Sequence, residues 1–367
     1  MAKLKVIISG GGTGGHIFPA IAIANAIKKL RPDTEFLFVG ALGRMEMTKV
    51  PEAGFEIVGL PIMGLQRKLN LKNLKFPFML LKSVAMAKKV VKDFKPNIAI
   101  GVGGYASGPL LRAANKAKVP TLLQEQNSYA GLTNKILGKN ASKICVAYDG
   151  MDAFFPKEKI ILTGNPVRSE VIKLEGKRER AAEFFEIDLS KKTLLVVGGS
   201  LGAWSVNEAV ENALEQWEKA GIQVIWQTGK LFHERAKKAA IGKESWLKVT
   251  EFIKRMDLGY AAADLVVSRA GALAVSELCL VKKPSIFVPL PSAAEDHQTK
   301  NAKVLTTLSA AKLIKDSEVR ELLGQTVLEL INNEEELNRL SKNISPLGYH
   351  DAADIIANEA IQLTIKN

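Results

Sequence analysis

The fold is decided by a glycine-rich stretch near the N-terminus, Ser9-Gly10-Gly11-Gly12-Thr13-Gly14-Gly15-His16. It lies between an apolar run at residues 4–8 and a helix-like run at 18–30. This order predicts a strand, a tight turn and the N-terminus of a helix. Glycines allow positive φ and let the backbone approach a bound group closely. The N–H groups and dipole of a helix N-terminus favour an anion, typically a phosphate.

A second stretch of the same kind opens the latter half of the chain. The apolar run 193–197 leads into Gly198-Gly199-Ser200-Leu201-Gly202-Ala203 and then into a helical pattern. At 367 residues the chain also exceeds the usual size of a single hydrophobic core. The sequence therefore predicts an α/β protein with two Rossmann-like domains and a cleft between them. We place the first domain at 1–163 together with a C-terminal helix within 346–367, and the second at 164–345.

Apolar runs alternate with helical patterns in both domains, as expected for parallel sheets with crossover helices. Strands are predicted at 3–9, 35–39, 56–60, 97–101, 120–124 and 143–147, and then at 193–197, 222–226, 247–250, 264–268 and 285–289. The alternation breaks near residue 164, and the densely charged stretch 173–192 follows. Ligands bind at the carboxyl ends of parallel strands, where the sequence has glycine turns and Glu125-Gln126-Asn127.

Composition limits the partners and the compartment. The net charge of +13 calls for an acidic partner, but no zinc-finger spacing, basic zipper or RNA-binding aromatic motif points to nucleic acid. Cys145 and Cys279 lie in apolar runs, which favours a reducing cytoplasm over a disulfide framework. The N-terminus does not have the pattern of a signal peptide, and no run reaches the roughly 18 apolar residues of a spanning helix. We expect a soluble chain, or one attached to a membrane surface.

One segment, residues 67–95, is strongly basic. It holds nine Lys and Arg residues against the single acid Asp93, and large apolar residues are interleaved with them. This pattern fits contact with an anionic membrane surface, where each base contributes on the order of 1 kcal/mol. It fits equally a solvated helix face above a stripe of core residues. The sequence leaves both interpretations open.

The spacing Gly10-x-Gly12-x-x-Gly15 matches the dinucleotide-binding fingerprint. That fingerprint needs an acidic residue at the end of the second strand to hold a ribose. The second strand ends at 38–42 without an acid, and Glu35 lies at its opening end. A nicotinamide-dependent oxidoreductase therefore loses most of its support, while a glycine turn without a ligand stays open.

Five polar side chains are further candidates for a site. His16 follows the glycines at a helix N-terminus, whose dipole disfavours the imidazolium and so suits a neutral base. Glu277 lies in the helix that follows residue 271, where a carboxylate can accept both hydroxyls of a ribose. Arg168 can reach a phosphate, and Gln298 and Asn301 share a helix face and suit sugar hydroxyls. Each of them could instead have a purely structural role. The four histidines are dispersed, so no metal or other cofactor is expected.

Together the motifs resemble the MurG family of bacterial UDP-N-acetylglucosamine transferases, in order along nearly the whole chain. The segments that carry the resemblance are Gly11-Gly12-Thr13-Gly14-Gly15-His16-x-x-Pro19, Gly103-Gly104-Tyr105-x-Ser107-Gly108-Pro109, Glu125-Gln126-Asn127, Ala130-Gly131-Leu132-Thr133-Asn134-Lys135, Gly164-Asn165-Pro166-Val167-Arg168, Gly198-Gly199-Ser200-x-Gly202-Ala203, Glu251-Phe252-Ile253 and Arg269-x-Gly271-Ala272-Leu273-x-Val275-x-Glu277.

The resemblance implies a GT-B fold, in which two Rossmann-like domains face a central cleft. It implies an inverting, metal-independent transfer of N-acetylglucosamine from UDP-N-acetylglucosamine (UDP-GlcNAc) to the muramyl 4-hydroxyl of lipid I. Lipid I is the undecaprenyl-pyrophosphoryl N-acetylmuramyl-pentapeptide, and the product is lipid II of peptidoglycan synthesis. The resemblance further implies peripheral attachment to an anionic membrane surface, at the cytoplasmic face.

The resemblance also assigns roles to single positions. From the chemistry of the transfer we nominate His16 as the base that takes the proton of the acceptor hydroxyl, and Glu125 stays open as the alternative. Glu277 is implied at the ribose, Ile253 at the uracil and Arg168 at the diphosphate. Further donor contacts are implied for Ser200, Ala272, Leu273, Ala274, Val275, Ser276, Gln298 and Asn301, and from the first domain for Thr13, Gly14, Gly15 and Asn127. Acceptor contacts are implied for Gly103, Gly104, Tyr105 and Ser107.

Other functions stay open at this point. Within the GT-B fold, a different lipid glycosyltransferase or a UDP-sugar epimerase is the nearest alternative. A nicotinamide oxidoreductase and a non-catalytic membrane scaffold are more distant ones. The predicted helix between Leu69 and Lys92 is richer in lysine than the family pattern, which leaves the lipid preference open.

Overall fold

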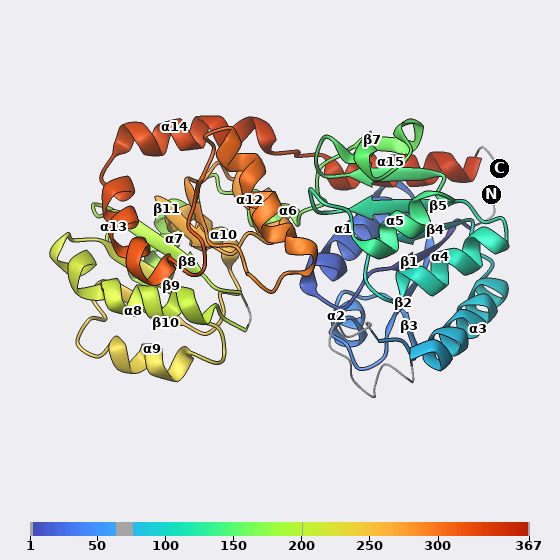
Figure 1. Ribbon diagram of the computed structural model, residues 1–367, viewed down its shortest axis with the longest axis horizontal. Helices are drawn as coiled ribbons and strands as arrows, with labels where there is room; N and C mark the ends of the chain where they lie inside the picture. The colour runs from blue at the N-terminus through green and yellow to red at the C-terminus, as the bar shows by residue number, and fades with distance from the viewer. Residues whose placement is uncertain (1–2, 64–75, 200, 366–367) are drawn as a thin grey trace. The chain divides into compact units, whose positions relative to one another are not determined.

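The computed structural model describes residues 3–63, 76–199 and 201–365, which form two compact units (Figure 1). The first unit runs to Arg168 and resumes at His350, and the second is Ser169–Tyr349. Each unit is built around one parallel sheet. The α/β class predicted from the sequence is therefore confirmed.

The sheet of the first unit has seven strands in the order β3-β2-β1-β4-β5-β6-β7. Its strands are β1 (Lys5–Ser9), β2 (Glu35–Ala41), β3 (Ile57–Leu60), β4 (Ile98–Gly101), β5 (Thr121–Glu125), β6 (Lys143–Val146) and β7 (Ile160–Leu162). The strand order reverses between β1 and β4, which are paired directly. Ligands of such sheets bind outside the carboxyl ends of the strands at this reversal, and both glycine turns of the first unit lie there.

Helices cover both faces of this sheet. Successive residues of a strand point to opposite faces, so Val6 and Ile8 pack in one cluster and Ile7 in another. The first cluster lies under α1 (Gly14–Leu30) and α15 (Ala352–Ile365), which lie side by side (Figure 1). The second lies under α3 (Phe76–Phe94) and α4 (Ser107–Lys116). Two shorter helices, α2 (Glu46–Glu52) and α5 (Leu132–Gly138), complete the unit's α-helices among the described residues.

The second unit repeats this plan with six strands in the order β10-β9-β8-β11-β12-β13. They are β8 (Thr193–Val197), β9 (Gln223–Gln227), β10 (Leu247–Thr250), β11 (Leu265–Ser268), β12 (Ser285–Phe287) and β13 (Lys312–Leu313). Its α-helices are α6 (Ser169–Ile172), α7 (Arg178–Phe185), α8 (Trp204–Lys219), α9 (His233–Ala239), α10 (Met256–Ala262), α11 (Ala272–Leu280), α12 (His297–Thr307), α13 (Val319–Ile331) and α14 (Glu334–Ile344). Leu194 and Leu195 pack in different core clusters, so this sheet too is covered on both faces.

The structure corrects several predicted elements. Helix α1 begins at Gly14 rather than at residue 18, so two glycines and His16 belong to its first turn. The charged stretch 173–192, for which no element was predicted, contains α7. Strands β7 and β13 were not predicted, since three and two residues are too short to show an apolar pattern. Among the described helices, none is both long and apolar enough to cross a membrane.

Candidate functional site

The two glycine turns of the first unit are in direct contact. Gly104 follows β4 with φ +88°, and a Cβ added there would collide with the backbone of Gly11. Only glycine permits both this conformation and this approach. The buried Ser107 hydroxyl lies 3.0 Å from the carbonyl oxygen of Ser9 and 2.8 Å from that of Gly103, and it has one proton to donate between them. Ser107 thus links the second turn to the end of β1, while Tyr105 beside it is exposed.

His16 lies in the first turn of α1, between these loops and the segment that follows β5. Its Nδ1 is 3.0 Å from the Oε1 atom of Gln126. A Cβ on Gly103 would lie 2.8 Å from both Cε1 and Nδ1 of the ring, so glycine at that position makes room for the imidazole. Thr13 is the N-cap residue, and the N–H of His16 donates to its carbonyl oxygen at 3.1 Å. The predicted base is therefore half-buried and held from two sides.

Glu125 is buried at the end of β5, and four N–H groups donate to its carboxylate. Asn127 donates to Oε1 from its backbone at 3.1 Å and from its side chain at 3.3 Å. The Gly131 N–H donates to Oε2 at 3.1 Å, and Asn134 Nδ2 donates to it at 2.9 Å. Both oxygens thus hold the loop between β5 and α5 in place.

Gln126 and Glu46 are two buried side chains of this region to which the sequence assigned no role. Gln126 is 1% exposed and contacts His16 as described above, and Glu46 is fully buried at the start of α2. The Oε2 atom of Glu46 accepts from the backbone N–H of Gly12 at 2.9 Å. Gln126 was named only as part of the Glu125-Gln126-Asn127 segment, and Glu46 belongs to no motif. Each contacts its partner across a long sequence separation, so no local pattern predicted these contacts.

Arg168 is the last residue of the first unit and is exposed. Its guanidinium lies over the ring of Phe18, 5.0 Å from the ring centroid. A cation stacked on an aromatic face keeps its charge and its N–H groups at the edge of the plane, where a phosphate can bind.

In the second unit, helix α11 begins beyond β11 with Gly271 as its N-cap. Val275 donates its N–H to the carbonyl oxygen of Gly271 at 3.0 Å, and its side chain is buried in the core. The N–H groups of the three preceding helical residues come before the first i to i−4 bond of the helix and point from its N-terminus. These residues are Ala272, Leu273 and Ala274. Ser276, one residue beyond Val275, is partly buried.

Glu277 is half-buried on α11, one turn beyond the helix start. The hydroxyl of Tyr260, from α10, donates to its Oε2 atom at 2.8 Å. Tyr260 is 3% exposed and was also missed from the sequence. The Tyr260 hydroxyl therefore orients the Glu277 carboxylate, which is the role of a residue that positions a ligand contact.

The remaining predicted residues of the second unit lie around the loops at the carboxyl ends of its strands. Ile253 is buried, and its N–H donates to Gln227 Oε1 at 3.0 Å. Gln298 accepts from the N–H of Leu290 at 3.0 Å. Asn301 is buried and donates to the carbonyl oxygen of Ala270 at 3.3 Å. Ser200 lies outside the described residues.

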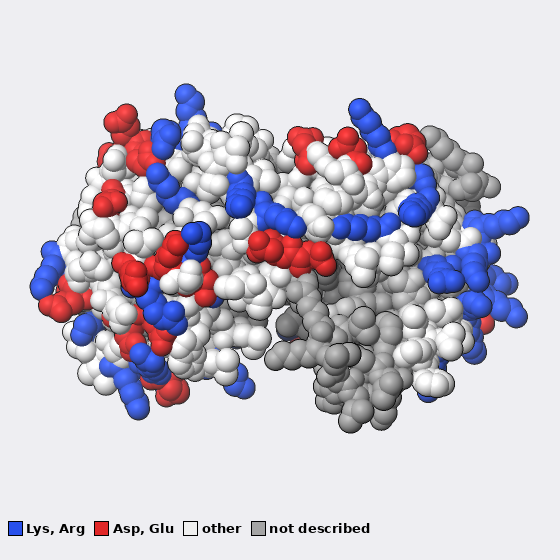
Figure 2. All heavy atoms as spheres, viewed as in Figure 1, with Lys and Arg blue, Asp and Glu red and all other residues white. Residues whose placement is uncertain are grey.

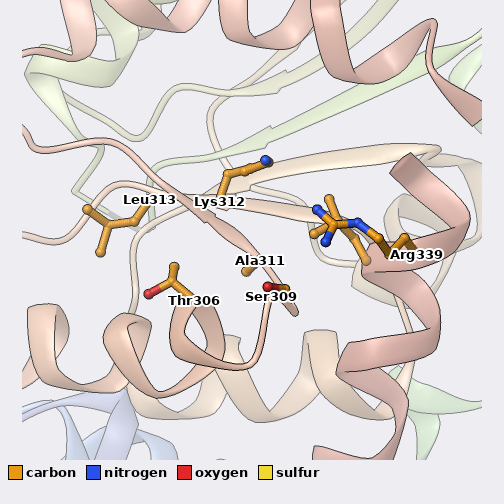
Figure 3. Close-up of a pocket in the computed structure, with 7 residues that line it drawn as sticks. Thr306, Ser309, Ala311, Lys312, Leu313 and Arg339 are labelled. Atoms are coloured by element: carbon orange, nitrogen blue, oxygen red, sulfur yellow. The ribbon is translucent and has the colours of Figure 1, made fainter. Parts of the chain in front are cut away.

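Two other features of the second unit involve residues to which the sequence assigned no role. Arg269 donates to Asp316 and to the backbone carbonyls of Val288 and Pro289. It thus links the loops that follow β11, β12 and β13. A pocket of about 270 Å³ lies between α12, β13 and α14 (Figure 3). Lys312 and Arg339 line it, but both pair with Glu336, so their charges are already compensated. In the part of the chain that the structure describes, no three His, Cys, Asp or Glu side chains are grouped to hold a metal ion.

Comparison with known proteins decides the family. The glycosyltransferase family 28 N-terminal domain matches residues 6–146, and the C-terminal domain of the same family matches residues 193–357. A Phocaeicola vulgatus protein named UDP-N-acetylglucosamine--N-acetylmuramyl-(pentapeptide) pyrophosphoryl-undecaprenol N-acetylglucosamine transferase is 54% identical over 366 residues, which cover 99% of this chain and 97% of that protein. The chain belongs to the MurG family.

Other relatives agree with the MurG assignment. A Cytophaga hutchinsonii protein of the same name is 54% identical over 359 residues, covering 98% of this chain and 96% of that protein. The crystal structure of Acinetobacter baumannii MurG matches with a TM-score of 0.79 at 29% identity, covering 98% of this chain and 99% of that chain. UDP-GlcNAc 2-epimerase from Neisseria meningitidis, with a TM-score of 0.66 at 15% identity, shares the fold alone. The MurG resemblance predicted from the motifs is thus confirmed.

Proposed function

We propose that the chain transfers N-acetylglucosamine from UDP-GlcNAc to the muramyl 4-hydroxyl of lipid I, with inversion at the anomeric carbon. The observation that carries this proposal is the 54% identity, over 99% of the chain, to a relative named for this reaction. The product, lipid II, serves peptidoglycan synthesis, and through it cell shape and division.

For the chemical step we propose His16 as the base. The acceptor hydroxyl oxygen forms a bond to the anomeric carbon, the bond from that carbon to the diphosphate breaks, and UDP leaves with the electron pair. The hydroxyl proton passes to the imidazole, a contribution of typically 10²–10⁴-fold in rate. Glu125 is less suited to this role because four N–H donors already occupy its two oxygens.

We assign the donor to the second unit and the acceptor to the first. The N–H groups at the start of α11 suit the diphosphate of the donor, whose charge rises as UDP leaves. Glu277, oriented by Tyr260, suits the ribose hydroxyls. The two glycine turns of the first unit suit the diphosphate of lipid I, because the backbones of Gly11 and Gly104 meet close to the N-terminus of α1.

We propose further that α3 attaches the chain to the anionic cytoplasmic face of the membrane. Phe78 and Leu81 on this helix are 75% and 69% exposed. Figure 2 shows Lys and Arg side chains gathered over the end of the first unit that carries α3; the exposed bases of this helix are Lys82, Lys88, Lys89 and Lys92. Apolar side chains that enter the interface and lysines that face anionic headgroups are the two elements of interfacial binding.

The reaction is tested with purified protein, labelled UDP-GlcNAc and a lipid I analogue, with and without EDTA. We expect labelled disaccharide and UDP to form at equal rates, and transfer to survive EDTA. Release of UDP without modification of the acceptor would overturn the proposal in favour of hydrolysis or epimerisation. Binding of the donor without any turnover would mean that the acceptor is a different molecule.

A further inference from the structure

We propose that Gln126 sets the tautomer of His16, so that Nδ1 carries the ring proton and Nε2 is the acceptor. The inference begins with the buried amides around the end of β5. Asn165 Nδ2 is 3.0 Å from the backbone carbonyl oxygen of Gln126, which can only accept. The amide of Asn165 must therefore point its NH2 group at that carbonyl, and its Oδ1 atom lies on the other side.

The orientation of Asn165 determines the orientation of Gln124. Gln124 Nε2 lies 2.9 Å from Asn165 Oδ1 and donates to it. The Oε1 atom of Gln124 then faces Nε2 of Gln126, with which it forms a short hydrogen bond. The backbone carbonyl of Gln126 thus fixes the orientation of the Asn165 amide, and Asn165 in turn fixes the orientation of the Gln124 amide.

A second backbone carbonyl fixes Gln126 independently. Gln126 Nε2 is 2.6 Å from the carbonyl oxygen of Val102 and 3.3 Å from that of Gln124. If the amide were turned over, its oxygen would face these acceptors with no proton between them. Because Gln126 is 1% exposed, water does not compensate for such a loss. The hydrogen bond to Val102 and the one to Gln124 Oε1 therefore require the same orientation of the Gln126 amide.

The orientation of Gln126 decides the protonation of the His16 ring. The Oε1 atom of Gln126 lies 3.0 Å from Nδ1 of His16 and can only accept, so Nδ1 must carry a proton. In the neutral imidazole the other nitrogen, Nε2, then has the lone pair. Neutral histidine in water favours the opposite tautomer, so the protein reverses the intrinsic preference.

This arrangement suits a base that must be neutral before it acts. A carboxylate beside Nδ1 would also stabilise the imidazolium, whereas an amide places the proton without adding a charge. Gln126 is thus a positioning residue that acts through His16. Its effect on catalysis rests on the proposed function, whereas the tautomer does not.

The tautomer is measured by NMR on protein with ¹⁵N-labelled histidine, at a pH where the imidazoles are neutral. The chain has four histidines, and the His16→Gln variant identifies the His16 signals by their loss. We expect Nδ1 to resonate as a protonated nitrogen and Nε2 as an unprotonated one. A protonated Nε2 in the unmodified protein would overturn the proposal, whatever the activity.

Substitution of Gln126 tests the consequence. Gln126→Leu keeps the approximate volume, and we expect its His16 signals to move toward the Nε2-protonated form. We expect kcat to fall about 10- to 100-fold, within the range for a base, while KM for UDP-GlcNAc stays within about twofold. Gln325→Leu, the same change at an exposed position of α13, should leave tautomer and kcat unaltered.

Three further outcomes separate this proposal from the proposed function. If Gln126→Leu shifts the tautomer but keeps full kcat, the catalytic role of Gln126 is wrong. If Gln126→Leu does not fold, the tautomer of His16 in the unmodified protein still decides the proposal, since an Nε2-protonated ring there overturns it. If the unmodified protein shows the expected tautomer but no transfer to a lipid I analogue, the proposed function fails and the tautomer assignment stands.

Discussion

The carboxylate of Glu46 accepts a hydrogen bond from the backbone N–H of Gly12, with 2.9 Å between Oε2 and the nitrogen. Its Oε1 atom accepts from the N–H of Ala41 at 3.0 Å. Helix α2 thus joins the end of β2 to the first glycine turn through one fully buried side chain. A Cβ on Gly40 would lie 2.5 Å from Cγ of Glu46, so the neighbouring glycine makes room for it.

Replacing Glu46 with Gln should destabilise the chain and impair acceptor use. Gln has nearly the same shape, but its amide nitrogen cannot accept, so one buried N–H loses its partner at a cost of roughly 1–3 kcal/mol. We expect that loss in the free energy of unfolding, measured by denaturant titration, and a several-fold lower kcat/KM for the acceptor. Glu52→Gln is the matched control, because Glu52 lies exposed on the same helix and pairs with Lys49 at 2.6 Å. Equal stability of the two variants would refute a role for Glu46 in holding the turn.

Removing the Tyr260 hydroxyl should weaken donor binding through Glu277. With Phe at position 260 the carboxylate loses the donor that orients its Oε2 atom. We expect KM for UDP-GlcNAc to rise about 3- to 10-fold, in line with a hydrogen bond to a charged group, and kcat to change little. In a Glu277→Ala background the same Tyr260→Phe change should have no further effect. Additive effects of the two substitutions would show that Tyr260 acts by another route.

Both cysteine thiols should resist modification in the folded chain. Cys145 and Cys279 are buried, and desolvation raises the pKa of each thiol to about 12. The reactive thiolate is therefore scarce near pH 8, where an ordinary thiol is partly ionised. A maleimide or disulfide reagent should label neither residue under native conditions and both after denaturation. Rapid labelling of the native protein would contradict this burial.

Membrane attachment should depend on the exposed face of α3. Lys88 and Lys92 are four residues apart on one helix face, whereas Lys89 already pairs with Asp93 at 2.7 Å. Replacing Lys88 and Lys92 with Gln should lower affinity for anionic vesicles roughly 10- to 30-fold, at on the order of 1 kcal/mol per base. Sedimentation with anionic vesicles measures this, and neutral vesicles should show little binding.

The apolar half of the same face is tested separately. Phe78→Ser combined with Leu81→Ser should reduce vesicle binding without lowering the free energy of unfolding, since both side chains are exposed. Leu231 and Ile241 are 71% and 72% exposed in the second unit and provide control substitutions. If both pairs of serine variants bind vesicles as the unmodified chain does, α3 is an ordinary solvated helix.

Much of the fold could be predicted because buried parallel strands are continuous apolar runs. This signal identified β1 and β8 together with the glycine turns that follow them. It failed for β7 and β13, which are only three and two residues long. The start of α1 was placed too late because glycine is a poor helix former, although Thr13 stands at the N-cap position just before Gly14.

The site was predicted only as far as local patterns reach. His16 and Glu277 stood out because each follows a strand and a glycine turn in the sequence. Gln126 did not, since its contact with His16 joins residues 110 positions apart. Glu46 and Tyr260 were missed for the same reason, because a hydrogen bond between distant segments leaves no periodic pattern in the sequence.

The central claim, inverting transfer to lipid I, is tested most directly by the structure of the product. The disaccharide formed from UDP-GlcNAc and a lipid I analogue is isolated, and proton NMR gives the configuration of its new glycosidic bond. UDP-GlcNAc carries an α-linked sugar, so we predict a β-linked disaccharide on the muramyl 4-hydroxyl and one UDP released per bond. An α-linked product, or UDP formed without a disaccharide, would contradict the account.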